Sequence, residues 1–303
     1  MTSIRLEVVR ATIALMIVSS VSAMPAFAQM PAHDMAGMDH SKNLTAKAQQ
    51  EIASVAKAMS SVGAMDAAAK AGFQPVFGWI PTMGVHWVDE TRMVKDKQSD
   101  ITAPDNLMFS KIAGKDSLVG AAYAYLAPVS DTTRPTLFDG APAWHEHQNL
   151  APPGQTLVML HVWFVPSPDG PFAGTNPNLP FWAAGLEAPD ASRMHDAAFS
   201  SRVRRASLAL SEVIDTTAIF PNLESRPAVR AVLFTRRDSV RALIPQLLAA
   251  QQAKDPAAWD KIADRLASQW DAMQAAYYDS ALTSAGKVRM ERFVAMLMGE
   301  HVH

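Results

Sequence analysis

The chain changes character near residue 190, and this change most narrows the folds open to it. Residues 73–183 are rich in aromatic and aliphatic side chains and are interrupted by prolines and glycines at short intervals. That pattern is typical of short strands joined by tight turns. Residues 191–303 are instead rich in Ala, Arg and Leu with few turn signals, which predicts helices. We therefore expect an α+β fold, with a small antiparallel β-rich core followed by an all-helical part.

Several elements can be placed within this scheme. Apolar residues recur at helical spacing between Leu44 and Ala71, which predicts an amphipathic N-terminal helix. Residues 106–112 and 118–126 flank a five-residue connection and predict a β-hairpin. Thr156–Val165 is rich in Val, Leu and Trp, as in a strand buried on both faces. In the C-terminal part we expect helices over about 195–214, 227–253, from 255 onward and 285–298.

The first 28 residues have the composition of a signal peptide. Arg5 and Arg10 precede an apolar run from Ala11 to Val18, and the small-residue site Ala26-Phe27-Ala28 follows it, which is typical of a cleavable secretory signal. No later apolar run reaches the ~18 residues of a membrane span. We therefore expect a periplasmic or secreted protein divided into a signal peptide (1–28), a flexible Met/His-rich leader (29–42), an α+β domain with the histidine cluster (43–190) and a helical domain (191–303).

Charge and cysteine content limit the possible partners. The net charge is −2, so no electrostatic argument favours a nucleic acid. The chain has no cysteine, which excludes thiolate ligands. Any bound metal must then be held by imidazole, carboxylate or thioether groups.

The leader combines thioether and imidazole side chains at close intervals. These donors favour copper, particularly Cu(I), and the segment resembles the Met/His-rich stretches of bacterial copper-resistance proteins. The alternative is a disordered start without a function of its own. The candidate leader ligands are Met30, His33, Met35, Met38 and His40.

A second group of histidines lies within the β-rich part. If residues 144–148 are extended, His145 and His147 share one face of a strand. His161 is the only ionisable residue inside the next strand, and His86 lies upstream. Three or four neutral imidazoles that converge in an apolar setting suit a transition metal such as copper or zinc. Because such ligands must be neutral, we expect release of the metal as the pH falls through roughly 6.

Three functions remain open for this group. In metal handling the cluster stores or passes the ion. In a metalloenzyme acting on a small apolar or aromatic substrate, Glu146 or Asp89 would hydrogen-bond to a metal-binding histidine or be the general base. In a metal-free ligand-binding module the histidines make only hydrogen bonds. We favour metal handling, because the chain has neither Gly-x-Ser-x-Gly nor His-Glu-x-x-His.

Residues 66–177 also resemble an uncharacterised family of secreted bacterial proteins. The shared motifs include Met83–Val88, which contains Met-Gly-x-His-aromatic, and Leu160–Trp163, which reads Leu-His-x-Trp. The resemblance implies that His86 and His161 belong to one recurring site. The resemblance implies no activity. The assignment of His145 and His147 to the same site rests on their spacing alone.

Overall fold

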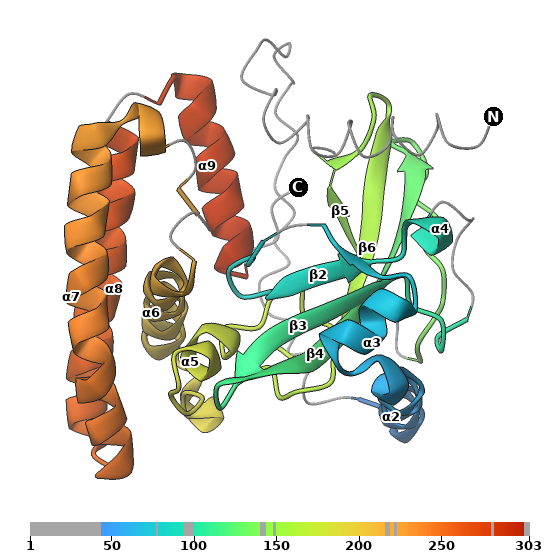
Figure 1. The fold of residues 1–303 in the computed structure, drawn as a ribbon, viewed down its shortest axis with the longest axis horizontal. Helices are drawn as coiled ribbons and strands as arrows, with labels where there is room; N and C mark the ends of the chain where they lie inside the picture. Colours follow the sequence, from blue (N-terminus) through green and yellow to red (C-terminus); the bar gives the residue numbers. More distant parts are fainter. Residues whose placement is uncertain are drawn as a thin grey trace.

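An antiparallel sheet with an N-terminal helix is followed by a helical region (Figure 1), which confirms the predicted α+β class. The computed structural model describes residues 44–76, 78–93, 100–139, 144–147, 150–215, 219–220, 223–279 and 282–299. The predicted signal peptide and the Met/His-rich leader lie outside these residues.

The sheet has six strands in the order β1-β2-β3-β4-β6-β5, and all neighbours are antiparallel. It is strongly twisted, since β5 and β6 stand nearly upright in Figure 1 whereas β2 and β3 lie across the view. β5 lies at one edge of the sheet, so β6 is an inner strand between β4 and β5. The strands are β1 (Gln74–Pro75), β2 (Val85–Val88), β3 (Asn106–Ile112), β4 (Lys115–Pro128), β5 (His145–His147) and β6 (Gln155–Trp163).

The predicted β3–β4 hairpin forms, but its connection is shorter than the expected five residues. Lys115 already pairs with Ile112, so Ala113 and Gly114 alone make the turn. Their φ values are 50° and 76°, and positive φ at both central residues is typical of a type I′ turn. The turn matches the twist of the two strands, which explains why pairing continues to its base.

The predicted N-terminal helix forms as three consecutive pieces, and Gly63 ends the second of them. They are α2 (Ala46–Ala58), a 3-10 helix (Met59–Val62) and α3 (Met65–Lys70). The Thr45 hydroxyl accepts a hydrogen bond from the Ala48 amide at 3.0 Å and caps α2. The buried side of α2 and the 3-10 helix packs on one face of the sheet together with Leu107, Phe109, Tyr123, Leu160 and Val162.

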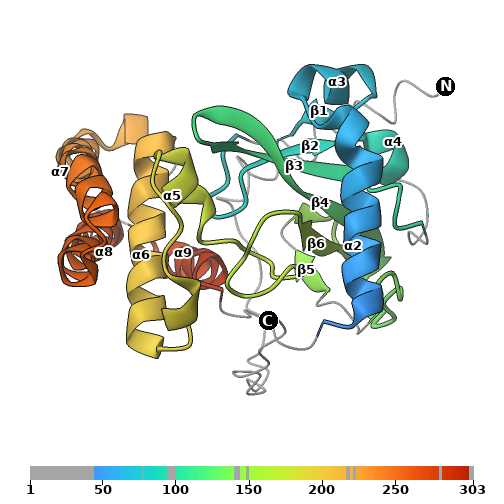
Figure 2. The ribbon, with the colours of Figure 1, turned by 90° about the horizontal axis from the view of Figure 1, so that it is seen from below.

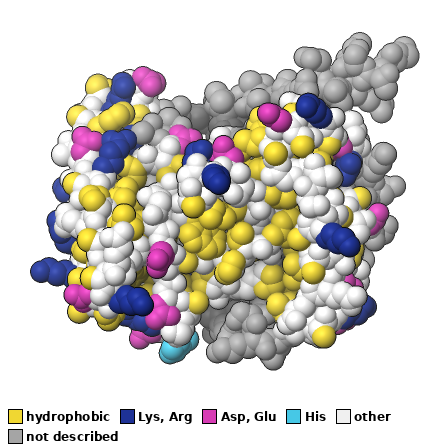
Figure 3. Space-filling view, turned by 60° about the horizontal axis from the view of Figure 1, so that its bottom comes forward, with side chains coloured by type: hydrophobic (Ala, Val, Ile, Leu, Met, Phe, Trp, Pro, Cys, Tyr) yellow, Lys and Arg dark blue, Asp and Glu magenta, His cyan; other side chains and the backbone are white. Residues whose placement is uncertain are grey.

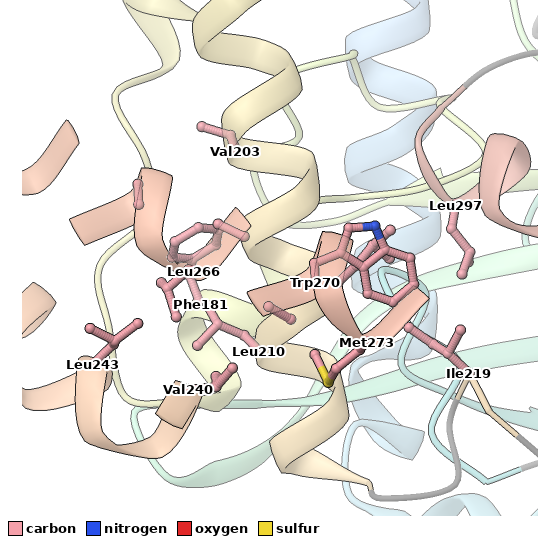
Figure 4. Packing of buried hydrophobic residues seen from close by; sticks show 14 of the residues in the cluster. Phe181, Val203, Leu210, Ile219, Val240, Leu243, Leu266, Trp270, Met273 and Leu297 are labelled. Atoms are coloured by element: carbon pink, nitrogen blue, oxygen red, sulfur yellow. The ribbon is translucent and has the colours of Figure 1, made fainter. Parts of the chain in front are cut away.

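Side chains from five helices converge in a second core, to which Met83 of the β-rich part also contributes (Figure 4). This core also includes Phe181 and Leu186, which precede residue 191, and the predicted domain boundary at residue 190 stays a prediction. α7 runs as one helix through Pro245. The helices are α5 (Leu179–Ala183), α6 (Ala197–Ile214), α7 (Pro227–Gln252), α8 (Pro256–Asp279) and α9 (Ser284–Leu297), with short 3-10 turns at Ala191–Arg193 and Leu223–Ser225.

The sheet lies between the long helices α6–α8 on one side and α2 on the other (Figure 2). On the face drawn in Figure 3, basic and acidic side chains are interspersed around apolar patches rather than segregated by sign. Among the helices of the described residues, none is both long enough and apolar enough to cross a bilayer.

Candidate metal centre

β5 and β6 place three histidines on one face of the sheet. His145 pairs with Met159 and His147 pairs with Leu157, and paired residues of antiparallel strands point to the same side. His161 follows Met159 by two positions on β6, so it shares that face as well. The predicted convergence of these three residues thus follows directly from the register.

β2 brings His86 to the same face. His86 pairs with Met108 of β3, Met108 pairs with Gly120 of β4, and Gly120 pairs with Trp163 of β6. Trp163 lies two positions after His161 and therefore on its face. A Cβ atom at Gly120 would lie 2.7 Å from the Val162 carbonyl oxygen and 2.6 Å from Met108 Cε, and because the first of these contacts is with backbone, the close packing requires glycine there.

The four imidazole rings form a continuous group. Ring centres are 4.8 Å apart for His145 and His161, 4.9 Å for His145 and His147, and 5.6 Å for His86 and His161. Three strand spacings of ~4.8 Å separate β2 from β6, so His86 and His161 lean toward each other across the sheet. The small residue Ala122, which pairs with His161, leaves space for this approach.

Burial keeps His86, His147 and His161 neutral near pH 7. His86 and His161 are 4% and 1% exposed. Desolvation, assisted by the positive charge that His161 and His147 would carry, lowers the pKa of His86 to about 3. Desolvation also lowers the pKa of His147 and of His161 to about 4, although the hydrogen bond to Gly174 partly opposes it at His161. These pKa values lie below the pH of roughly 6 at which the sequence led us to expect release of a metal, and that expectation stays a prediction.

One hydrogen bond fixes the tautomer of His161. Its Nδ1–H donates to the Gly174 carbonyl oxygen at 2.7 Å, so Nε2 carries the lone pair of the neutral ring. Nε2 is buried and has no hydrogen-bond partner among the described residues. The Trp163 indole holds the same segment in place, because its Nε1–H donates to the Ala173 carbonyl oxygen at 2.7 Å. Sequence reasoning missed Gly174, since a backbone carbonyl leaves no residue-type signal.

The two carboxylates considered as general bases have partners elsewhere. Asp89 Oδ1 accepts from the Thr91 amide and hydroxyl at 3.0 and 2.6 Å, and Oδ2 lies 2.9 Å from Arg92 Nε. Asp89 thus caps the short helix α4 (Glu90–Met93). Glu146 points away from the histidine face and pairs with Arg134. Neither set of contacts supports the role that the sequence suggested for these residues.

The histidines do not yet surround a single point. Among the described residues, no group of three or more His, Asp and Glu side chains is already arranged to hold a metal ion. Comparisons of the chain with protein-family models, with curated proteins and with solved structures gave no match. The resemblance to secreted bacterial proteins and the role of the histidines as ligands therefore stay predictions.

Proposed function

We propose that this protein binds a transition-metal ion, copper or zinc, through His86, His145, His147 and His161, and that it handles metal outside the cytoplasm. The observation that carries the proposal is the state of His161. Histidines that bind metals commonly donate their other ring N–H to a carbonyl or carboxylate oxygen, as His161 does to Gly174. A buried polar atom without a partner costs ~1–3 kcal/mol, and a metal ion at Nε2 would remove that cost.

The ring spacing supports the proposal. Imidazoles that bind one ion at ~2.0–2.1 Å in tetrahedral geometry have ring centres about 5 Å apart, and the observed separations are 4.8–5.6 Å. These are three of the six pairs in the group, and each already has the spacing that a shared ion requires. His145 and His147 are only partly buried and lie on a three-residue strand, so their side chains have room to turn.

The contacts of the two candidate carboxylates favour metal handling over catalysis. A hydrolytic metal site commonly has a general base beside the metal-bound water. Asp89 and Glu146, the two candidates for that role, are engaged with Arg92 and Arg134. A metalloenzyme with a small apolar or aromatic substrate and a metal-free ligand-binding module are the alternatives, and turnover or ligand binding without metal would identify them.

The proposal can be tested by replacing the central histidine in a protein whose leader cannot bind metal. In a background with Met30, Met35 and Met38 changed to Leu and His33 and His40 changed to Gln, we expect His161→Gln to weaken Co(II) and Zn(II) binding by more than ~10-fold. Direct titration followed by Co(II) absorption bands measures this. The matched control is His195→Gln, because His195 is an exposed residue outside the group.

Two results would contradict the proposal. One is unchanged affinity in His161→Gln, and the other is a leader-substituted protein that binds no metal at all. Because His161 is buried and its replacement could disturb folding, His145→Gln on the partly exposed strand β5 is the second variant. It should lower the affinity while leaving circular dichroism and thermal unfolding unchanged.

A further inference from the structure

We propose that the ion held by the histidine group is Cu(I), and that the Met159 thioether sulfur binds it beside His161 and His145. This inference rests on the proposed metal-binding function and goes beyond it, since it assigns an additional ligand and selects the metal. It follows from the position of Met159 in the sheet and from the charge of the available donors.

Met159 occupies the position between the two histidines. It precedes His161 by two residues on β6 and pairs directly with His145 on β5. Cβ atoms of such cross-strand pairs are ~4.5–5.5 Å apart, and the rings of His145 and His161 are themselves 4.8 Å apart. The three side chains are thus the corners of one triangle on the same face of the sheet.

Small neighbours leave this triangle uncrowded. Across β4, Met159 faces Ala124 and His161 faces Ala122, and neither alanine extends beyond Cβ. Met159 is 7% exposed, and it packs in a small apolar group with these alanines, Ala151 and Leu157. A thioether is flexible and polarizable, and it can turn its sulfur toward the imidazoles over these two alanines.

The charge of the donors favours a monovalent ion. Two neutral imidazoles and a thioether supply no negative charge, and the carboxylates of Asp89 and Glu146 are paired elsewhere. Transfer of an ion from water into a protein interior costs a free energy that increases with the square of its charge in the Born description. A dication would thus be far more costly to bury here than Cu(I). Thioether ligands also select Cu(I), and imidazole binds copper well.

The test removes the sulfur and keeps the volume. In the leader-substituted protein, Met159→Leu should lower Cu(I) affinity by more than ~10-fold and change Zn(II) affinity by less than ~2-fold, because zinc rarely takes thioether ligands. Competition with a chromophoric Cu(I) chelator under anaerobic, reducing conditions measures the Cu(I) affinity. X-ray absorption at the copper edge reports the loss of sulfur scattering. Met59→Leu is the control, since Met59 is also 7% exposed but packs on the opposite face of the sheet.

Each outcome distinguishes this inference from the proposed function. Equal loss of Cu(I) and Zn(II) affinity in Met159→Leu, or no loss of either, overturns the assignment of the sulfur. Tight Zn(II) binding with weak Cu(I) binding in the unchanged cluster overturns the choice of metal and leaves the histidine site standing. A cluster that binds neither ion removes both proposals.

Discussion

At the scale of single residues, the histidines that we propose as ligands also affect the stability of the fold. His86, His147 and His161 stay neutral in the folded protein until the pH approaches their pKa values of about 3, 4 and 4, whereas the ordinary value is 6.5. The unfolded chain therefore binds more protons than the folded chain below pH 6.5. This depressed pKa means that the stabilising contribution is complete above pH 6.5 and is lost as the pH falls toward 4.

We accordingly predict that the metal-free protein becomes less stable on acidification. Three such groups should lower the free energy of unfolding by roughly 4–6 kcal/mol between pH 7 and pH 5. Urea unfolding at several pH values measures it. His147→Gln should reduce the pH dependence and His195→Gln should not. A denaturation midpoint that stays constant from pH 7 to pH 5 would exclude neutral, buried imidazoles.

At the scale of elements, the segment 166–178 connects the histidine site to the helical region. Its Gly174 carbonyl oxygen holds His161, and its Pro177 carbonyl oxygen accepts a hydrogen bond from the Ser207 hydroxyl of α6 at 2.9 Å. Asp169 pairs with Arg204 of α6 at 2.5 Å. The orientation of one imidazole therefore depends on a helix that begins more than thirty residues later in the sequence.

Loosening this segment should weaken metal binding from a distance. We predict that Arg204→Ala lowers metal affinity by ~10-fold, the size of effect known for partners that orient ligands. Arg205→Ala is the control, because Arg205 pairs with Asp271 of α8 and not with the segment. Isothermal titration of both variants, with thermal unfolding of the metal-free forms, separates an effect on the site from a loss of stability. Equal affinities in the two variants would refute the connection.

Which parts of the site the sequence could predict depends on the kind of signal. The period of two in His145-x-His147 and the histidine in the next strand are local patterns, and they predicted the convergence of these residues. The approach of His86 was expected from the resemblance, but its physical basis is the strand order, which places β2 three strands from β6 and which no local pattern shows. Met159 could have been found, because it lies two positions before His161, whereas Gly174 acts through its backbone and could not.

At the scale of the whole molecule, α6 joins the sheet side to the other helices. It holds segment 166–178 on one side, and on the other its Glu212 pairs with Arg237 of α7, both side chains being 0% exposed. Arg237 Nη2 and Nε donate to Glu212 Oε2 at 2.5 and 3.0 Å. Burial still raises the pKa of Glu212 to about 7, although the guanidinium opposes this.

Breaking the pair from one side should destabilise the chain strongly. We predict that Arg237→Met costs ~3–5 kcal/mol, because it leaves a buried carboxyl group without its partner. The double variant Glu212→Gln with Arg237→Met should be more stable than Arg237→Met alone. Chemical denaturation followed by circular dichroism measures both. If the single variant is as stable as the original protein, the pair is not buried as described.

The position of β5 at the edge of the sheet has a consequence for exchange of the proposed metal ion. β5 is three residues long and pairs with β6 alone, whereas His86 and His161 lie on inner strands. An edge strand can detach without opening the core, so under the proposed function His145 and His147 would leave the ion while the other two imidazoles still hold it. Dissociation in two stages would let an acceptor protein supply its own ligands before the last bond breaks, and faster amide hydrogen exchange at Glu146 than in β6 would reveal the opening.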